Sequence, residues 1–398
     1  MLYLGIDLHR KQLTVSLRDE QGDVTLRRQV STRPTKVEEF LMQLKDRSGA
    51  DGYAAMLEVC GFEEWLVKRL REEPACREVV VIQPEKPSKK KTDRRDANQL
   101  GEVLWVNRQR LLAGQKVRGV RRIYIPTPTE QEDRQLTAWR QRLGRRRTQT
   151  INRIRHILRR HNLEWEQPTK GFQTRKVRWW LRKLSLGEVD RVEVDQLLEQ
   201  WEMWDRQIKA IEERIAERFE RDAKAQLLAT IIGVSCYMAL AIASRIGDLS
   251  RFPSPRSLAN FFGLTPRSRS TGDKERLGSI SKEGSQIVRF LLGQLVVHVL
   301  RRDAKMRAWY KRIKQRRGSK IARVAVMRRL TVIMWHMLAK QEPYHYGGEP
   351  TRTRPAVDAP ALANDLEKHH RELMSALGVR AAVEVSAGES TGSSSLSG

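Results

Sequence analysis

Residues 2–31 read LYLGIDLHRKQLTVSLRDEQGDVTLRRQVS, and this stretch decides the fold of the N-terminal part of the chain. Apolar residues gather over 2–8, 12–18 and 24–31, with polar turns between them, which predicts three successive strands. Beyond them the pattern predicts helices and strands in alternation: a helix over 36–45, a strand over 53–59, a helix over 63–72, a strand over 78–83, a basic loop over 86–91 and a helix from Thr92 past Trp105. Three meandering strands followed by this alternation predict an α/β domain with a mixed sheet.

Four acidic residues stand where an ordinary surface position does not explain them: Asp7, Glu58, Asp93 and Asp96. The first two each end an apolar strand, and the other two lie three residues apart at the start of a helix, on one face. This is the order of a ribonuclease-H-like fold, in which acids on the first and fourth strands and on a late helix meet. Clustered carboxylates suit hard divalent cations, so two Mg²⁺ ions are the predicted cofactor. Strand capping and pairing with neighbouring Lys or Arg are the alternative roles.

The chain is strongly basic, because Lys and Arg number 76 against 48 acids among 398 residues, for a formal net charge of +28. Nucleic acid is the predicted partner, since a polyanion relieves the self-repulsion of such a chain and binds with an affinity that falls with salt. A basic protein without activity is the alternative that composition leaves open. The cysteines lack metal or disulfide spacing, and no signal peptide or 18-residue apolar run is present, which predicts a cytoplasmic protein that does not contact membranes.

Residues 126–225 are predicted to form a helical domain. TPTEQE at 127–132 is typical of a helix start, and the helix behind it has one apolar face: Leu136, Trp139, Leu143, Ile151, Ile154 and Leu158. After a loop with Trp179 and Trp180, a second helix carries a heptad seam that is compatible with a hairpin or a dimerising coiled coil: Leu197, Trp201, Trp204, Ile208, Ile211 and Ile215. Nine arginines with few acids among them predict a phosphate-binding or RNA-binding surface on the first helix: Arg140, Arg142, Arg145, Arg146, Arg147, Arg153, Arg155, Arg159 and Arg160.

A third domain is predicted over 226–341, followed by a tail over 342–398 that is expected to be disordered. The domain begins with two short helices around a glycine-containing turn, and after GLTPR it has a polar loop with several hydroxyls. A hydroxyl between Arg267 and Arg269, with a glycine nearby, suits a nucleophile that attacks a phosphate. Phosphate binding without catalysis is the alternative for this loop. The basic residues of this segment are predicted to contact phosphates: Arg267, Arg269, Lys274, Arg276, Lys282 and Arg289.

The segments GIDLHRK, LEVCG, KTDRRDA and STGDKERLGSISKEGSQIVRFLL resemble the DEDD transposases of bacterial insertion sequences, a family of bridge-RNA-guided serine recombinases. The resemblance spans most of residues 1–340. It implies a resolvase-like, ribonuclease-H-like DEDD domain over 1–125, a coiled-coil domain over 126–225 and a mostly helical transposase domain over 226–341. The catalytic, metal-binding acids fall on the four residues above: Asp7, Glu58, Asp93 and Asp96. The nucleophile falls just before Gly272, where Ser270 is preferred, Thr271 is the local rival and Ser281 is less favoured.

The resemblance also implies an activity. Donor and target double-stranded DNA would be cut and rejoined through a covalent phosphoserine and a Holliday junction, with Mg²⁺ held by the acids. A structured bridge RNA would specify both DNAs by base pairing, and the protein would form dimers that pair into a tetramer. Two alternatives remain: a metal-dependent Holliday-junction resolvase or nuclease without a serine nucleophile, and an RNA-binding or chromosome-architectural protein whose acids only pair with arginines.

Overall fold

The computed structural model describes residues 1–84, 93–271 and 274–344, without the side chains of 84, 93–95, 268–271 and 274–277. The chain divides into two compact units, of which the first ends at Thr127 and the second begins at Pro128. The predicted basic loop over 86–91 and the tail from residue 345 lie outside the described residues. Among the described helices, none combines the length and the apolarity that a membrane crossing requires.

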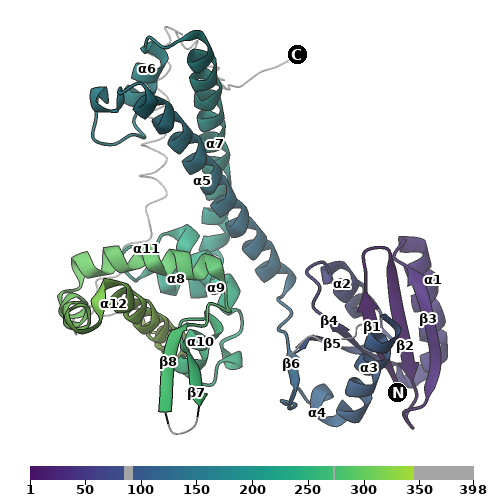
Figure 1. Cartoon of the computed structure of the whole chain (residues 1–398). Helices are drawn as coiled ribbons and strands as arrows, with labels where there is room; N and C mark the ends of the chain where they lie inside the picture. The colour runs from purple at the N-terminus through teal and green to yellow at the C-terminus, as the bar shows by residue number, and fades with distance from the viewer. Residues whose placement is uncertain (85–92, 272–273, 345–398) are drawn as a thin grey trace, which may run out of the picture. The chain divides into compact units, whose positions relative to one another are not determined.

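The first unit is built on a six-stranded mixed sheet in the order β3-β2-β1-β4-β5-β6 (Figure 1). β1 pairs in parallel with β4 and β4 with β5, whereas the other pairs are antiparallel. The elements are β1 (Leu2–Leu8), β2 (Gln12–Arg18), β3 (Val24–Ser31), α1 (Pro34–Ser48), η1 (Gly49–Asp51), β4 (Tyr53–Glu58), α2 (Glu64–Glu72), β5 (Cys76–Pro84), α3 (Asp93–Val106), α4 (Arg108–Leu112) and β6 (Val120–Arg122). The predicted strands and helices of this part are confirmed.

Helices cover both faces of the central strands. On one face, Leu4, Ile6 and Leu57 belong to a core with residues of α1 and α2, and on the other, Tyr3 and Met56 pack with residues of α3. Strand side chains alternate between these faces, which explains why β1 and β4 are apolar at almost every position. A charged residue is therefore confined to the strand ends.

The second unit begins with two long helices, α5 (Pro128–Arg160) and α7 (Glu188–Glu220), which lie side by side (Figure 1). They are joined by residues 161–187, here called the hairpin tip, which contain η2 (Glu164–Glu166) and α6 (Arg175–Lys183). The expected loop around Trp179 and Trp180 is wrong, because both residues lie in α6. The hydroxyl of Thr174 caps this helix by accepting from the Val177 amide at 3.3 Å.

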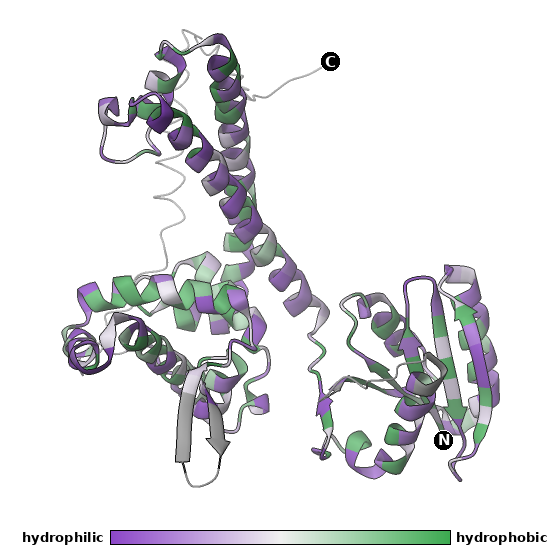
Figure 2. Cartoon of the chain, in the orientation of Figure 1, coloured by the Kyte–Doolittle hydropathy of each residue, from purple (hydrophilic) through white to green (hydrophobic). Residues whose placement is uncertain are grey.

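The apolar seam of α7 follows a different line from the predicted one. Three of the predicted residues are buried, namely Trp201, Ile208 and Ile215, and three are only partly buried, namely Leu197, Trp204 and Ile211. The alternate positions on the α5 side are taken instead by Leu198, Asp205 and Glu212. On α5, Trp139 was expected on the apolar face but is 40% exposed. Figure 2 shows that both helices are mostly hydrophilic, so ion pairs join them as well as apolar contacts.

The rest of the second unit is mostly helical: α8 (Ala223–Ala229), α9 (Cys236–Ile246), η3 (Leu249–Arg251), α10 (Pro255–Phe261), α11 (Gln286–Arg302) and α12 (Ala304–Lys340). The predicted pair of short helices around a glycine turn is confirmed, and Gly233 in that turn has a φ of +91°. The predicted polar loop after GLTPR is wrong, because its residues form an antiparallel hairpin of β7 (Pro266–Thr271) and β8 (Lys274–Ile280). The sequence feature that could have predicted this hairpin is Gly272-Asp273, a dipeptide typical of two-residue hairpin turns.

Candidate active site and nucleic-acid interface

Asp7 and Glu58 lie at the carboxyl ends of two neighbouring parallel strands, as the second-last residue of β1 and the last residue of β4, on the same face of the sheet. The register pairs Ile6 with Leu57, so the next residue along each strand is one of the two acids. Alternation places both on the face that α3 covers, and neighbouring strands lie about 4.8 Å apart. Both residues are half-buried. The fold therefore brings these two carboxylates together at the carboxyl ends of β1 and β4.

A glycine contact holds α3 against β1. A Cβ atom on Gly5 would lie 2.1 Å from the carbonyl oxygen of Ala97 and 2.3 Å from the amide nitrogen of Gly101, so only glycine permits this approach. Asp96 directly precedes Ala97 in the chain. The contact therefore sets the distance between the N-terminal part of α3 and the strand that ends at Asp7.

Hydrogen bonds show the direction in which α3 crosses the sheet. Asn98 Oδ1 accepts from Ser16 Oγ at 3.2 Å, and Glu102 Oε2, one turn later, accepts from Arg18 Nη2 at 3.4 Å. On β2, Arg18 lies opposite the beginning of β1 and Ser16 lies nearer to its end. α3 thus runs antiparallel to β1, and its first turn is directed toward the strand ends that carry the two carboxylates.

Three of the four predicted acids thus belong to one edge of the sheet: Asp7, Glu58 and Asp96. Asp93 is the first residue of α3, but its side chain lies outside the described residues. Among the described side chains, no group of three His, Cys, Asp or Glu residues stands close enough to hold a metal ion. The donor set still fits a hard divalent ion, because all of its members are carboxylates.

His9 contacts this site, although the sequence pattern indicated only a turn residue there. Its Nε2 atom lies 2.9 Å from Oδ2 of Asp7, and the two side chains are 44% and 19% exposed. The signal was the Asp-x-His spacing at the end of a strand, since residues two apart project to the same face. The imidazole orients the Asp7 carboxylate and is a further polar group beside it.

The predicted nucleophiles lie on the hairpin of the second unit. Ser270 pairs with Glu275 and Thr271 with Lys274 across the hairpin, and the side chains of both candidates lie outside the described residues. Ser281 is different, because its residue is 8% exposed and its hydroxyl is buried without a hydrogen-bond partner in the described part of the chain. In this fold the hydroxyl of Ser281 is therefore not accessible from solvent.

Two glycines fix the base of this hairpin. A Cβ on Gly284 would lie 1.9 Å from the carbonyl oxygen of Phe261, and Gly263 has a φ of +67°. Arg289 donates to the carbonyl oxygens of Phe262 at 3.1 Å and Gly284 at 2.6 Å, and burial lowers the pKa of its guanidinium. Arg289 therefore supports the hairpin. Of the other predicted phosphate contacts, Arg267 and Lys282 are exposed, and three have side chains outside the described residues: Arg269, Lys274 and Arg276.

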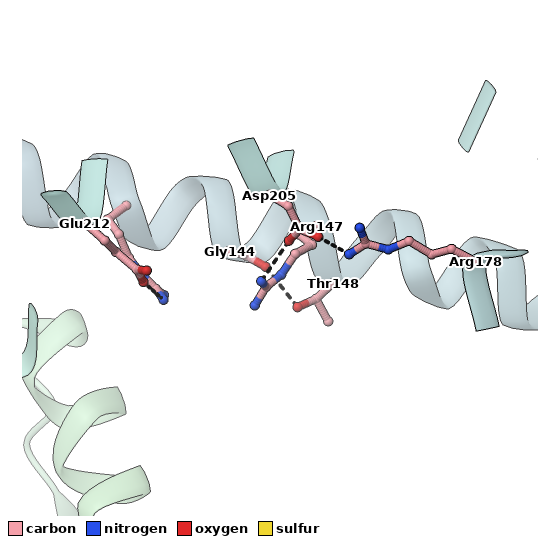
Figure 3. Close-up of polar contacts among 7 residues, drawn as sticks. Gly144, Arg147, Thr148, Arg178, Asp205 and Glu212 are labelled. Atoms are coloured by element: carbon pink, nitrogen blue, oxygen red, sulfur yellow. Dashed lines mark hydrogen bonds and ion pairs between the residues drawn. The ribbon is translucent and has the colours of Figure 1, made fainter. Parts of the chain in front are cut away.

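The nine arginines that were predicted to bind phosphates or RNA all lie on α5 and fall into two groups. Five of them donate to carboxylates, in the pairs Arg140–Glu212, Arg147–Asp205, Arg153–Glu193, Arg159–Glu164 and Arg160–Asp190. Asp205 accepts from Arg147 at 3.0 Å and also from Arg178, so this one carboxylate joins α5, α6 and α7 (Figure 3). Few acids lie among these arginines in the sequence, but in the folded chain α7 brings the partners of four of the five pairs from 30 to 72 residues away.

The other four of these nine arginines have no ion pair with a described residue: Arg142, Arg145, Arg146 and Arg155. Three of their guanidinium groups lie over aromatic rings, 5.2 Å from the centroid of Trp139, 5.4 Å from that of Trp204 and 4.7 Å from that of Phe172. Stacking on a ring holds a guanidinium in place and leaves its charge uncompensated. In the part of the chain that the structure describes, these four guanidinium groups are the predicted ones whose charge has no paired carboxylate.

Comparison with known proteins identifies the class. A family model described as "Transposase IS116/IS110/IS902 family" matches residues 225–311, and a DEDD transposase model of the IS110 group matches residues 4–163. Over 353 residues the chain is 28% identical to "Transposase for insertion sequence element IS1111A" of Coxiella burnetii, which covers 86% of this chain and 91% of that protein. It is 27% identical over 365 residues to a "Probable family 20 transposase" of Pseudomonas aeruginosa, which covers 86% and 98%.

The mixed sheet with acids at its strand ends, followed by a mostly helical unit, is consistent with a DEDD nuclease-like transposase. The chain belongs to the IS110/IS116 family of insertion-sequence transposases. Such transposases cleave and rearrange DNA, and those of the DEDD class typically use divalent metal ions.

Proposed function

We propose that this transposase cuts and rejoins donor and target DNA through a covalent phosphoserine, with both DNAs selected by a structured bridge RNA. The four acids would hold divalent metal ions, expected to be Mg²⁺, and Ser270 would supply the nucleophile. The observation that carries the proposal is the convergence of two strand-end carboxylates and the first turn of α3 at one edge of the sheet. The strand order supports a ribonuclease-H-like, resolvase-like domain over residues 1–125.

The proposed step forms a bond from Ser270 Oγ to phosphorus while the bond from phosphorus to the 3′ oxygen breaks. The serine hydroxyl loses its proton, and the departing 3′ oxygen takes one up. A bound divalent ion would supply neutralisation of the charge that gathers on the phosphate. A 3′-hydroxyl of the second DNA then attacks the phosphoserine, which forms the new phosphodiester and restores the serine. One such exchange between two duplexes leaves them joined through a Holliday junction.

In this proposal the helical second unit binds the RNA and joins the protomers. Residues 126–225 would act as the coiled-coil domain through which protomers form dimers and then a tetramer, while residues 226–341 carry the nucleophile. The four unpaired arginines of α5 would contact the bridge RNA through its phosphates, because their charge is not neutralised within the described part of the fold.

Trapping of a covalent adduct tests the nucleophile. The purified protein, with the RNA that copurifies with it, is incubated with donor DNA that carries a nick next to the cleavage site, so that the cut fragment diffuses away. We expect a protein–DNA adduct that Ser270→Ala abolishes and Thr271→Ala retains. Adduct with both variants would exclude both residues as nucleophiles. Cleavage without any adduct from the unmodified protein would favour a metal-dependent resolvase or nuclease that uses water.

A matched pair on α3 tests the acids. Asp96→Asn should abolish cleavage, whereas Glu102→Gln, on the same helix but toward the beginning of β1, should retain most of it. Both variants should still bind RNA, which separates the proposal from that of a purely RNA-binding or architectural protein. Equal activity of Asp96→Asn and the unmodified protein would show that this acid takes no part in the reaction.

A further inference from the structure

The hairpin tip differs in charge from the two long helices α5 and α7, here called the shaft of the hairpin. The tip contains six Lys or Arg residues against two acids, Glu164 and Glu166, and Glu164 pairs with Arg159 of α5. Two of the six pair with acids of α7, Arg178 with Asp205 and Arg182 with Glu202. Along the shaft, by contrast, carboxylates pair with five of the nine predicted arginines of α5. Positive charge is therefore concentrated at the tip, although the shaft has more arginines.

The tip also exposes two large aromatic side chains. Trp165 in η2 is 89% exposed and Trp179 in α6 is 61% exposed. The tryptophan next to it, Trp180, packs against the core between α5 and α7, so α6 turns one indole inward and the other outward. An exposed tryptophan leaves a large apolar surface in water, which is unfavourable unless a ligand or partner covers it.

The charged and aromatic groups of α6 form a single stripe. Lys176, Trp179 and Lys183 are spaced by three and four residues, which aligns them along one face of the helix, and all three are exposed. The Nζ atom of Lys183 lies 3.9 Å from the centroid of the Trp179 ring. This cation holds the indole in one orientation from one side. The opposite face of α6 buries Val177 and Leu181, so the stripe faces away from the protein core.

We infer that this stripe, together with Trp165, binds unpaired nucleotides of a single-stranded nucleic acid, with bases stacked on the indoles and phosphates on the lysines. A base presents a flat π surface with a phosphate about one nucleotide repeat away, which matches an indole flanked by two ammonium groups on one helix face. A duplex would leave the indoles unused, because its bases are stacked on one another. A loop of the proposed bridge RNA and a displaced DNA strand both offer this chemistry.

The inference rests on the proposed function only in that the protein handles nucleic acid. The two fail differently, because binding at the tip is measured without cleavage. If Ser270→Ala loses the covalent adduct but binds unpaired oligonucleotides as the unmodified protein does, the two claims are separate. Loss of tip binding in a variant that still forms the adduct on a minimal nicked DNA would overturn the tip inference alone.

Fluorescence anisotropy of the full-length protein tests it, with labelled oligouridine, oligothymidine and an RNA duplex of equal length as probes. Trp179→Ala should weaken binding of the single strands about tenfold and leave duplex binding unchanged, and Trp165→Ala should act in the same direction. Val189→Ala, which changes an 80% exposed aliphatic residue at the start of α7, serves as the control and should have no effect. Trp179→Phe keeps a ring and should retain most of the affinity.

Lys176→Ala provides an independent measurement, since loss of one phosphate contact should lower the slope of log K against log salt by about 0.7 for a single strand. Stronger binding of oligouridine would identify RNA as the ligand, and stronger binding of oligothymidine a displaced DNA strand; each supports a nucleotide-stacking tip. Equal losses for duplex and single strands would overturn the inference in favour of a purely electrostatic patch. Unchanged binding of single strands by both tryptophan variants would overturn it altogether and assign the exposed indoles to a protein partner.

Discussion

Substitution of Gly5 by alanine tests the central geometric claim, that close approach of α3 to β1 positions the acid of the helix. The added methyl group would lie 2.1 Å from a backbone oxygen of α3, which is about 1.3 Å inside the 3.4 Å at which ordinary Cβ contacts begin. The atoms of α3 that the methyl group would meet all belong to the backbone, so a side-chain rotation cannot relieve the overlap. The helix must move by about 1 Å, and a misplacement of that size in a catalytic constellation costs about 100-fold in rate.

The assay is excision of a donor element from a plasmid, quantified by junction-specific amplification in cells that supply the associated RNA. We expect excision to fall about 100-fold, while overpacking lowers the free energy of unfolding by about 1–3 kcal/mol. Gly293→Ala in α11 is the matched control, because a Cβ there meets nothing within 4 Å and alanine favours helix by about 1 kcal/mol. Excision within twofold of normal, with unchanged stability, would refute the claim that the Gly5 contact sets the position of Asp96.

Three further predictions concern the helical unit. Arg245→Ala should lower the free energy of unfolding by about 2 kcal/mol, because this buried guanidinium donates to Thr137 Oγ1 of α5 at 3.0 Å, and burial lowers its pKa to about 10. Thermal melts measure the change in stability, and an unchanged midpoint would contradict the role assigned to Arg245. Asp133→Asn should raise stability at neutral pH, because burial disfavours the charged carboxylate and raises its pKa in the folded state. Between the unfolded and the folded pKa, the folded state retains a proton that the unfolded state releases, so stability is lost as pH rises through the folded pKa. Urea titrations at pH 4 and pH 8 should therefore differ less for the variant than for the unmodified protein. Asp205→Ala should lower the free energy of local unfolding of the hairpin by about 2 kcal/mol, because it leaves Arg147 and Arg178 without their shared acceptor. Faster amide exchange in α6 would show this, and exchange rates like those of the unmodified protein would show that the ion pairs are dispensable.

Local patterns in the sequence were sufficient for the first unit. The alternation and turn residues of 2–31 identified three strands, and the apolar runs that end at Asp7 and Glu58 identified the strands on which those acids lie. These signals depend on neighbours within a few residues, so they survive without knowledge of the fold. The hairpin of β7 and β8 was not predicted, because its strands are polar on both faces and a strand is recognised in a sequence by its apolar alternation.

Long-range electrostatics were the main point at which the sequence misled. Arg140 and Arg147 lie among few acids along α5, yet Glu212 and Asp205 reach them from α7, 72 and 58 residues further on. A helix pattern shows which residues share a face but not which face of another helix will meet it. The neutralisation of the shaft, and the contrast with the basic tip, could therefore be recognised only after the two helices were placed against each other.

The sequence by itself determined the class of chemistry: a basic chain with four acids at strand and helix ends, followed by a hydroxyl-bearing segment. Residue type and local spacing are enough for that, because strand ends and helix starts are local features. The tertiary structure decided which acids share an edge, that His9 contacts Asp7, that the hydroxyl of Ser281 is buried, and which cations keep their charge. Each of these depends on contacts between elements, since burial and ion pairing are set by what packs against a side chain and not by what precedes it in the chain.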